Sequence, residues 1–213
     1  MIIAVDGPAA SGKGTLARRL ARHFGYAYLD TGLLYRAVGL ALLEAGADPA
    51  DEQAAVAIAG RIDPAQLSAP GLRSEAAGQA ASKVAAMGEV RALLLAFQRD
   101  FAAHPPGGLA GAVLDGRDIG SVVCPQADRK IYVTASLERR AERRFKELRE
   151  QGGAIIQDAV LRDMQERDAR DMSRAVAPLK PADDAFVLDT SELDADQAFA
   201  AALGFIESRR RGG

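Results

Sequence analysis

The amino-terminal segment carries the pattern that most limits the fold. An apolar run, Ile2-Ile3-Ala4-Val5, is too short for a helix and stops at Asp6-Gly7-Pro8, which predicts a buried strand that enters a tight loop. From Thr15 to Phe24, apolar residues recur three and four positions apart with arginines between them, and this spacing predicts an amphipathic helix. A strand, a loop and a helix in this order are typical of the start of a parallel α/β sheet.

Later segments continue the alternation of strands and helices. Short apolar runs predict further strands at residues 26–29, 112–114, 130–133 and 185–188. Helical periodicity predicts helices at residues 33–45, 74–86, 90–103, 137–150, 157–172 and 194–209. The stretch 48–78 is rich in Ala, Gly and Pro and has poor periodicity, so we expect a loosely packed insertion there. The order of these elements predicts an α/β fold.

The size and composition of the chain suit one globular domain. It has 213 residues, of which 48% are apolar and 26% are charged. The longest uncharged apolar stretch, residues 37–43, is far shorter than the ~20 residues that a membrane span needs, and no signal-peptide pattern is present. We therefore expect a cytoplasmic protein without a membrane partner. No long apolar seam occurs, so we expect a monomer.

The composition also limits the chemistry. One cysteine and two histidines argue against a disulfide framework, a zinc cluster or a histidine-activated nucleophile, so catalysis must rest mainly on Asp, Arg, Lys and backbone groups. The formal net charge is −2 and no basic stripe is interleaved with aromatic residues, which argues against a nucleic-acid partner. Most of the basic residues are arginine, whose planar guanidinium group recognises phosphate and carboxylate through paired hydrogen bonds.

The loop after the first strand matches part of a phosphate-binding motif. Residues 7–13 meet the Gly-x4-Gly-Lys part of the P-loop pattern, between a predicted strand and a predicted helix. Glycines let backbone N–H groups wrap around phosphate oxygens, and the start of the helix adds the positive end of its dipole. We expect Lys13 to reach the β and γ phosphates of a nucleotide. Gly14 separates it from Thr15, which becomes a candidate Mg²⁺ contact; the alternative is an ordinary glycine-rich turn.

Two further charged segments follow strands and suggest an acceptor site. Asp30-Thr31-Gly32 precedes a helix that carries Arg36, and residues 115–120 follow the third strand. Parallel α/β proteins bind ligands at the carboxyl edge of the sheet, where both segments lie. Charges at the end of a buried strand must be solvated or paired, so packing alone explains them poorly. Thr31 also suits a helix cap.

The chain contains no asparagine, so the guanine-reading Asn-Lys-x-Asp signature is absent and ATP is the favoured donor.

Five blocks of the sequence resemble bacterial cytidylate kinases in the same order. They are residues 7–15, Asp30-Thr31-Gly32-x-x-Tyr35-Arg36, Ser82 with Arg91, Asp115-Gly116-Arg117-Asp118-Ile119-Gly120, and residues 166–179. The resemblance implies a single P-loop nucleoside monophosphate kinase domain over residues 1–213. It implies a five-stranded parallel sheet flanked by helices, a monophosphate-binding insertion at about 31–105 and a lid at about 139–158. The implied reaction is phosphoryl transfer from MgATP to CMP or dCMP.

The same resemblance assigns roles to individual residues. It places ATP on Gly7, Pro8, Ala9, Ala10, Ser11, Gly12, Lys13, Gly14 and Thr15, with Arg139 and Arg143 from the lid. It places the acceptor phosphate on Arg36, Arg117 and Arg174, the cytosine base on Ser82, Arg91 and Asp118, and the rest of the acceptor on Thr31, Arg167 and Asp171. The implied catalytic residues are Lys13, Asp115, Arg117 and Arg174, and Thr15 and Asp115 would hold Mg²⁺, in part through water.

Several alternatives stay open on the sequence alone. The chain fits another small P-loop kinase acting on UMP, AMP or a phosphate-free acceptor such as shikimate, although the last would leave the three arginines unused. It also fits a nucleotide-gated regulatory protein. Arg139, Arg140, Arg143 and Arg144 of the predicted helix 137–150 suit a solvated, salt-bridged face as well as an ATP contact. The segment of residues 63–73 is shorter than the corresponding segment in members of the family, so we expect a reduced insertion. Gly152-Gly153 suit a hinge for the lid.

Overall fold

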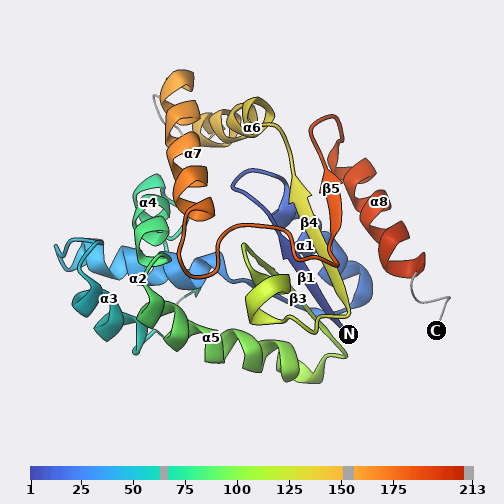
Figure 1. Ribbon diagram of the computed structural model, residues 1–213, viewed down its shortest axis with the longest axis horizontal. Coiled ribbons are helices and arrows are strands. Elements are labelled where there is room, and N and C mark those ends of the chain that lie inside the picture. The colour runs from blue at the N-terminus through green and yellow to red at the C-terminus, as the bar shows by residue number, and fades with distance from the viewer. Residues whose placement is uncertain (63–66, 151–155, 209–213) are drawn as a thin grey trace.

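The core of the protein is a parallel sheet. The structure, a computed structural model, describes residues 1–62, 67–150 and 156–208. Within these residues one sheet is formed by β1 (Ile2–Asp6), β2 (Ala27–Asp30), β3 (Ala112–Gly116), β4 (Arg129–Thr134) and β5 (Phe186–Asp189). The strand order is β2-β3-β1-β4-β5, and every neighbouring pair is parallel (Figure 1). The predicted five-stranded parallel α/β fold is confirmed.

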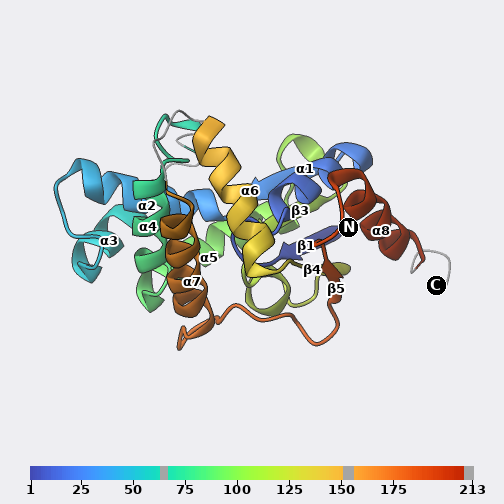
Figure 2. The same ribbon diagram turned by 90° about the horizontal axis from the view of Figure 1, so that it is seen from above.

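Helices flank the sheet on both faces and extend beyond one end of it. They are α1 (Lys13–Phe24), α2 (Gly32–Glu44), α3 (Glu52–Ala59), α4 (Glu75–Val84), α5 (Gly88–Ala103), α6 (Leu137–Glu150), α7 (Gln157–Met172) and α8 (Ala195–Ser208). Two short turns, η2 (Pro106–Gly108) and the π-helical η3 (Ile119–Val123), flank β3. Figure 2 shows α2, α3 and α4 at one end of the molecule and α8 at the opposite end. None of the described helices has the length and apolar content needed to cross a membrane.

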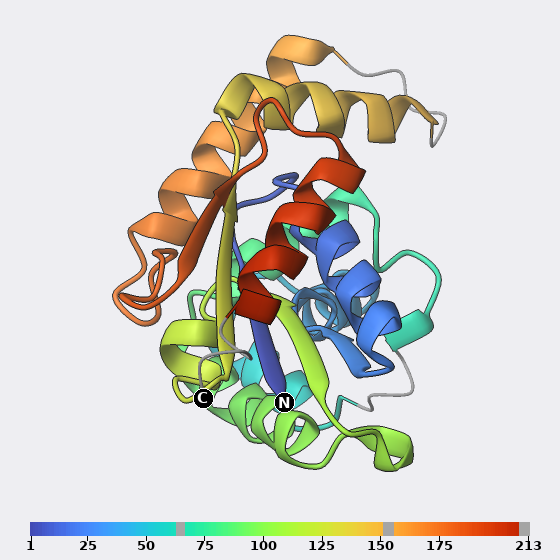
Figure 3. The ribbon, with the colours of Figure 1, turned by 90° about the vertical axis from the view of Figure 1, so that its right-hand side faces the viewer.

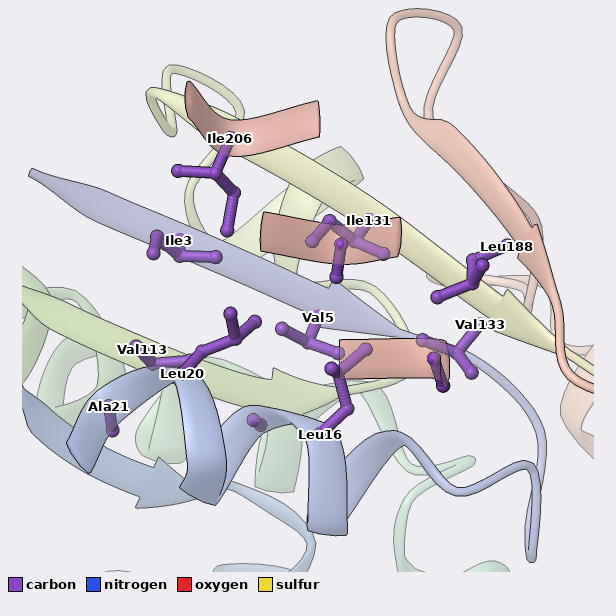
Figure 4. Close-up of a cluster of buried hydrophobic side chains, with 13 residues drawn as sticks. Ile3, Val5, Leu16, Leu20, Ala21, Val113, Ile131, Val133, Leu188 and Ile206 are labelled. Atoms are coloured by element: carbon purple, nitrogen blue, oxygen red, sulfur yellow. The ribbon is translucent and has the colours of Figure 1, made fainter. Parts of the chain in front are cut away.

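The central strands are buried on both faces, which explains their unbroken apolar runs. Ile3 and Val5 of β1 pack in one cluster with α1 and α8, and Ala4 between them joins a second cluster on the opposite face. Figure 4 shows the first cluster, in which Leu16 and Leu20 of α1 face the sheet. This packing fixes the start of α1, and therefore the loop before it, against the end of β1.

The segment between β2 and β3 forms a second core of its own. Helices α2, α3, α4 and α5 share a cluster of buried side chains centred on Val38, Leu42 and Val84. The expectation of loose packing over residues 48–78 is wrong for α3. Asp51 caps this helix by accepting a 3.0 Å hydrogen bond from the Ala54 N–H, and its small alanines pack inward. Alanine is small and a strong helix former, so the contrast between apolar and polar residues that reveals periodicity is weak in this segment.

Helices α6 and α7 stand beyond the carboxyl ends of the strands. In Figure 3, α6 lies at the top of the molecule and β4 runs up to it. Ala141 of α6 and Val160 and Met164 of α7 form a small separate cluster, against which Ala9 and Ala10 of the P-loop pack. The two helices therefore contact the loop that follows β1. The expected hinge at Gly152-Gly153 lies outside the described residues.

Candidate active site

A cleft of about 280 Å³ opens at the carboxyl edge of the sheet. Its walls come from the loops after β1, β2 and β3 and from helices α2, α4, α6 and α7. The predicted site residues that line it are Ala9, Ala10, Ser11, Gly12, Lys13, Gly14, Thr15, Thr31, Arg36, Ser82, Arg91, Asp115, Arg117, Asp118, Arg167, Asp171 and Arg174. The predicted residues Gly7, Pro8, Arg139 and Arg143 lie outside its lining.

The P-loop has the backbone conformation that its glycines make possible. Gly7 has a φ of 151° and Gly12 a φ of 88°, and a Cβ at Gly7 would collide with the Val133 carbonyl oxygen. Ala10 also has a positive φ, of 57°, which is uncommon for a residue with a side chain and is found at functional sites. Among the described residues no side chain caps the start of α1. Its first N–H groups are therefore open to an anion.

Lys13 and Asp115, which both line the cleft, form an ion pair. Lys13 Nζ lies 3.0 Å from Asp115 Oδ1, and the Tyr28 hydroxyl donates a 3.2 Å hydrogen bond to Asp115 Oδ2. Burial, together with the negative charge of Asp115, raises the pKa of Tyr28, so this hydroxyl stays protonated. Thr31 donates from both its N–H and its hydroxyl to the Asp115 carbonyl oxygen, at 3.0 and 2.9 Å. These contacts tie the ends of β2 and β3 to the P-loop.

The oxygen atoms beside Lys13 suit a hard cation. Asp115 offers a buried carboxylate and Thr15 a hydroxyl, and such ligands match the preference of Mg²⁺. In the described part of the chain, no three or more His, Cys, Asp or Glu residues are grouped to hold a metal. Mg²⁺ commonly binds through one or two protein oxygens together with water and substrate phosphates. The residues therefore fit a cation that arrives with a nucleotide.

Three arginines from distant parts of the chain line the same cleft. Arg36 comes from α2, Arg117 from the loop after β3 and Arg174 from the segment after α7. Arg36 Nη1 donates to the carbonyl oxygens of Leu72 and Ser74, at 2.9 and 3.0 Å. Burial, with the neighbouring positive charges, lowers the pKa of both Arg36 and Arg174. A bound dianion would relieve this repulsion.

Asp171 of α7 holds two of these arginines. Its Oδ2 accepts a 3.0 Å hydrogen bond from Arg117 Nε, and its other oxygen pairs with Arg174. Burial alone would raise the pKa of Asp171, but the charges of Arg117 and Arg174 hold that pKa below its usual value. The carboxylate is therefore ionised and orients both guanidinium groups before any ligand binds.

Arg167, one turn earlier on α7, keeps unused hydrogen-bonding capacity. Burial lowers its pKa to about 10, and the positive charge of Arg117 adds to the effect. Among the described residues, the buried Nε atoms of Arg167 and Arg174 have no hydrogen-bond partner. A buried donor without a partner costs free energy, so these groups indicate that a polar or anionic ligand belongs in the cleft.

A buried pair, Arg91 of α5 and Asp118 of the loop after β3, closes the far wall. Arg91 also donates to the Ala85 carbonyl oxygen at 3.2 Å, and its guanidinium group lies 5.5 Å from the centre of the Tyr35 ring. Ser82 of α4 is also buried and lines the same cleft. A carboxylate, a guanidinium group and a hydroxyl together offer both donors and acceptors to a planar heterocycle.

The arginines of α6 differ in where their side chains reach. Arg143 donates to the Thr190 carbonyl oxygen at 2.5 Å and lies 3.5 Å from the Ser11 carbonyl oxygen, so it reaches the P-loop from outside the cleft. Arg144 lines the cleft itself and pairs with Glu75 of α4. Arg139 instead donates to the Ser191 carbonyl oxygen at 3.0 Å and points away from the cleft.

Arg140, also on this helix, is buried. It pairs with Asp168 at 2.6 Å and donates to the Ala9 carbonyl oxygen of the P-loop at 3.3 Å. The alternative of a solvated, salt-bridged face therefore describes Arg139 and does not describe Arg140.

The sequence of the chain is similar to a family model and to known proteins. A family model for cytidylate kinase matches residues 3–208. The chain is 66% identical over 209 residues to a cytidylate kinase of Paramagnetospirillum magneticum, which covers 98% of this chain and 99% of the relative. The chain belongs to the cytidylate kinase family. A cytidylate kinase of Rhodospirillum rubrum is 63% identical over 206 residues, with 97% of each chain covered.

Solved structures support the fold only. A crystal structure of an uncharacterized protein from Eubacterium ventriosum superposes with a TM-score of 0.59 over 98% of this chain and 99% of that chain. The two sequences are 15% identical. The assignment to the cytidylate kinase family therefore rests on the sequence relatives, and the structure adds the geometry of the cleft.

Some polar residues of this cytidylate kinase family member were not identified from its sequence. Arg170 of α7 donates to Ser82 Oγ at 3.3 Å and to Gln79 Oε1 at 2.8 Å, although the segment 166–179 was recognised as a block. Tyr28 also touches the site without an assigned role. Each acts through a partner distant in sequence, which local spacing does not reveal.

Asp6 is the other missed residue. It is the last residue of β1, directly before Gly7, and from the sequence alone it marks only the end of a strand. Its two carboxylate oxygens accept hydrogen bonds from the N–H groups of Ile119 and Gly120, each at 2.7 Å. Burial raises the pKa of Asp6 to about 7 and outweighs the two hydrogen bonds, which lower it. A charge placed directly after a buried strand was the available signal.

Proposed function

We propose that this member of the cytidylate kinase family transfers the γ-phosphoryl group of MgATP to CMP or dCMP, giving ADP and CDP or dCDP. One observation carries the proposal. The P-loop with Lys13 and the arginines Arg36, Arg117 and Arg174, which come from distant parts of the chain, line the same cleft. Two anionic nucleotides that meet head to head need positive charge on both sides of the reacting phosphates.

On the donor side, the P-loop backbone from Gly7 to Gly12 binds the ATP phosphates, and Lys13 contacts the β and γ phosphates. Binding lets Lys13 exchange part of its pairing with Asp115 for phosphate oxygens. Asp115 and the Thr15 hydroxyl are the residues that would hold Mg²⁺, in part through water. When bound, Mg²⁺ supplies neutralisation of phosphate charge.

On the acceptor side, the guanidinium groups of Arg36, Arg117 and Arg174 hold the α-phosphate of CMP. Arg167 and Asp171 hold the ribose, and Thr31 borders the acceptor site. We assign this binding to the insertion at about 31–105, and we assign residues 139–158 to a lid. Arg143 is the lid arginine best placed for ATP in this conformation, because it already reaches the P-loop while Arg139 points elsewhere.

Base selection follows from the polarity of the far wall. Asp118 accepts a hydrogen bond from the exocyclic amine of cytosine, and Arg91 and Ser82 complete the polar contacts to the ring. Uracil presents an acceptor oxygen where cytosine presents that amine, so a carboxylate repels it. The buried ion pair with Arg91 keeps Asp118 oriented for this contact.

The chemical step needs alignment and charge neutralisation. A non-bridging oxygen of the CMP α-phosphate forms a bond to the γ-phosphorus, and the bond from that phosphorus to the β,γ-bridging oxygen breaks, which leaves ADP. The attacking oxygen carries no proton near neutral pH, so no general base is required. Lys13 and Arg117 stabilise the charge that shifts between the phosphates, and Arg174 holds the acceptor in line.

The proposal extends to the state of the protein in the cell. One chain supplies both sides of the cleft, which supports a monomer, and free nucleotides of the cytoplasm are its substrates. Analytical ultracentrifugation checks the first statement, and localisation of a tagged chain checks the second.

An acceptor panel tests the function. The purified protein is incubated with ATP and Mg²⁺ and with CMP, dCMP, UMP, AMP or shikimate in turn, and ADP formation is measured. We expect fast turnover with CMP or dCMP, slower turnover with UMP and none with shikimate. Turnover of AMP or shikimate without CMP overturns the substrate. ADP release that is independent of every acceptor overturns the kinase reaction.

A further inference from the structure

The loop that carries Arg117 and Asp118 is held from a neighbouring strand. β1 and β3 are adjacent and parallel, and Asp6 lies opposite Gly116 in their register. From this position the Asp6 carboxylate reaches across to the residues just after Asp118. Oδ1 accepts from the Ile119 N–H and Oδ2 from the Gly120 N–H, both at 2.7 Å.

These two N–H groups begin the π-helical turn η3. Asp118 precedes the turn, and in the described residues its side chain does not cap it, because that carboxylate pairs with Arg91. The Asp118 carbonyl oxygen instead accepts from the N–H groups of Val122 and Val123, at 2.9 and 3.1 Å. Asp6 therefore supplies the cap that Asp118 does not, and it leaves the Asp118 carboxylate available to the cleft.

The surroundings leave this loop little freedom to adopt another position. Ile119 is fully buried, and a Cβ at Gly120 would lie 3.1 Å from Lys130 Cδ and 3.4 Å from Asp6 Oδ2. Lys130 itself pairs with Asp184 at 2.8 Å. The glycine lets the backbone approach both β4 and the Asp6 carboxylate closely, so the contact between Asp6 and the turn is tightly built.

We infer that Asp6 is a positioning residue for the acceptor site: its two hydrogen bonds to Ile119 and Gly120 fix the loop that presents Arg117 and Asp118 to CMP. Asp6 directly precedes the P-loop in sequence, yet its side chain contacts the acceptor-side loop. The inference rests on the proposed function. It adds that a residue next to the ATP-binding loop controls binding of the other substrate.

The substitution Asp6→Asn tests this assignment by a split in kinetic constants. The amide keeps the size of the side chain but has one acceptor oxygen, and its NH₂ group faces the second N–H. Measurements at about pH 8.5 keep the wild-type carboxylate ionised. We expect the KM for CMP to rise by roughly tenfold to a hundredfold, the scale of a lost charged hydrogen bond, while the KM for ATP changes by less than about threefold.

The matched control is Asp128→Asn. Asp128 accepts a 2.6 Å hydrogen bond from the Ile2 N–H, so it is also an aspartate bound to a backbone N–H, but at the other end of β1. We expect both KM values to stay at the wild-type level in this variant. Equal increases in the two KM values for Asp6→Asn, or a fall in kcat alone, overturn the inference.

A second variant decides the question if Asp6→Asn does not fold, as judged by circular dichroism. Gly120→Ala keeps the carboxylate but pushes the turn away from Asp6 and Lys130. The same selective rise in the KM for CMP supports the inference, and unchanged or equally raised KM values overturn it. Wild-type protein that does not phosphorylate CMP would refute the proposed function instead, so the two failures are distinguishable.

Discussion

Lys13 Nζ lies 3.0 Å from Asp115 Oδ1, so the lysine of the P-loop and the aspartate near the end of β3 are already paired before a nucleotide binds. The pair holds the flexible lysine side chain close to where the phosphates are expected. It also keeps a buried carboxylate from standing alone at the end of an apolar strand. A substitution on either side of the pair should therefore alter catalysis.

Removing the lysine should abolish most of the turnover. In Lys13→Ala the charge that stabilises the transferring phosphoryl group is lost, and kcat should fall by about a hundredfold to a thousandfold. Steady-state kinetics with ATP and CMP measure the change, and circular dichroism checks that the fold is intact. Lys83→Ala, on the exposed side of α4, is the control and should retain wild-type kcat. Near-normal rates in Lys13→Ala would remove the lysine from its assigned role.

The Tyr28 hydroxyl offers a milder change to the same aspartate. Tyr28→Phe removes only the hydrogen bond to Asp115 Oδ2, so kcat should fall by roughly threefold to tenfold, the effect of one hydrogen bond. The concentration of Mg²⁺ that gives half-maximal activity should shift as well, because the orientation of Asp115 is less fixed. Both are read from initial rates across a Mg²⁺ series.

Tyr26→Phe is the matched control for this substitution. The Tyr26 ring stacks on Phe24, away from Asp115, so removing its hydroxyl should leave rates and Mg²⁺ dependence unchanged. Identical behaviour of the two variants would contradict a role for Tyr28 in orienting Asp115.

The sheet was predictable from the sequence because each central strand is buried on both faces and therefore reads as an unbroken apolar run that ends at glycine, threonine or aspartate. The P-loop was predictable because phosphate binding demands glycines at fixed spacing. Helix α3 was missed because its alanines give no contrast between faces. The turn η3 was missed because the Asp6 carboxylate, from another strand, holds it in place.

The site divides in the same way. Residues that we propose to contact ligand, such as Lys13 and Asp118, stand in recognisable blocks of sequence. Residues that orient them do not, because their effect depends on contacts between distant segments. Arg170 reaches Ser82 from another helix, and nothing in the spacing of either segment predicts that hydrogen bond.

Base selectivity should depend on Asp118. Asp118→Ala removes the acceptor for the cytosine amine, so the preference for CMP over UMP in kcat/KM should weaken by about 1 to 3 kcal/mol, the usual discrimination of a base-edge contact. Competition assays with both acceptors measure the ratio. Asp100→Ala, an exposed aspartate of α5, should keep the wild-type ratio. Unchanged discrimination in Asp118→Ala would mean that another residue reads the base.

The raised pKa of Asp6 predicts a pH dependence of stability. An aspartate whose pKa moves from 3.8 to about 7 on folding holds its proton more tightly in the folded state. Asp6 therefore makes its full stabilising contribution to the folded state below pH 3.8. This contribution is lost as the pH rises to about 7. Asp6→Asn removes the titration, so the free energy of unfolding of the wild type relative to this variant should fall between about pH 4 and pH 7 by a few kcal/mol.

Urea unfolding across this pH range measures the free energy of unfolding of the wild type and of Asp6→Asn. In the difference between the two values, the titration of every group that the two proteins share cancels. Asp128→Asn provides the comparison for an exposed aspartate. A constant difference between wild type and Asp6→Asn at every pH would show that the carboxylate titrates at an ordinary pKa.

Gly78 in α4 predicts a conflict between helix stability and acceptor binding. Glycine inside a helix is less stable than alanine by about 1 kcal/mol, so Gly78→Ala should favour the helix itself. A Cβ at this position would, however, lie 2.9 Å from Arg36 Nη2 and force the guanidinium group out of its place beside the Leu72 and Ser74 carbonyl oxygens. The KM for CMP should therefore rise about tenfold, the scale of one charged contact, with the KM for ATP unchanged.

Gly204→Ala in α8 separates the two effects. This glycine also lies inside a helix, but a Cβ there meets no atom within 4 Å. The substitution should raise the free energy of unfolding by about 0.5 to 1 kcal/mol and leave both KM values unchanged. If Gly78→Ala behaves like Gly204→Ala in kinetics as well as in stability, the position of Arg36 does not limit acceptor binding. A selective loss of CMP affinity in Gly78→Ala alone would mean that the glycine is kept in α4 to make room for the arginine.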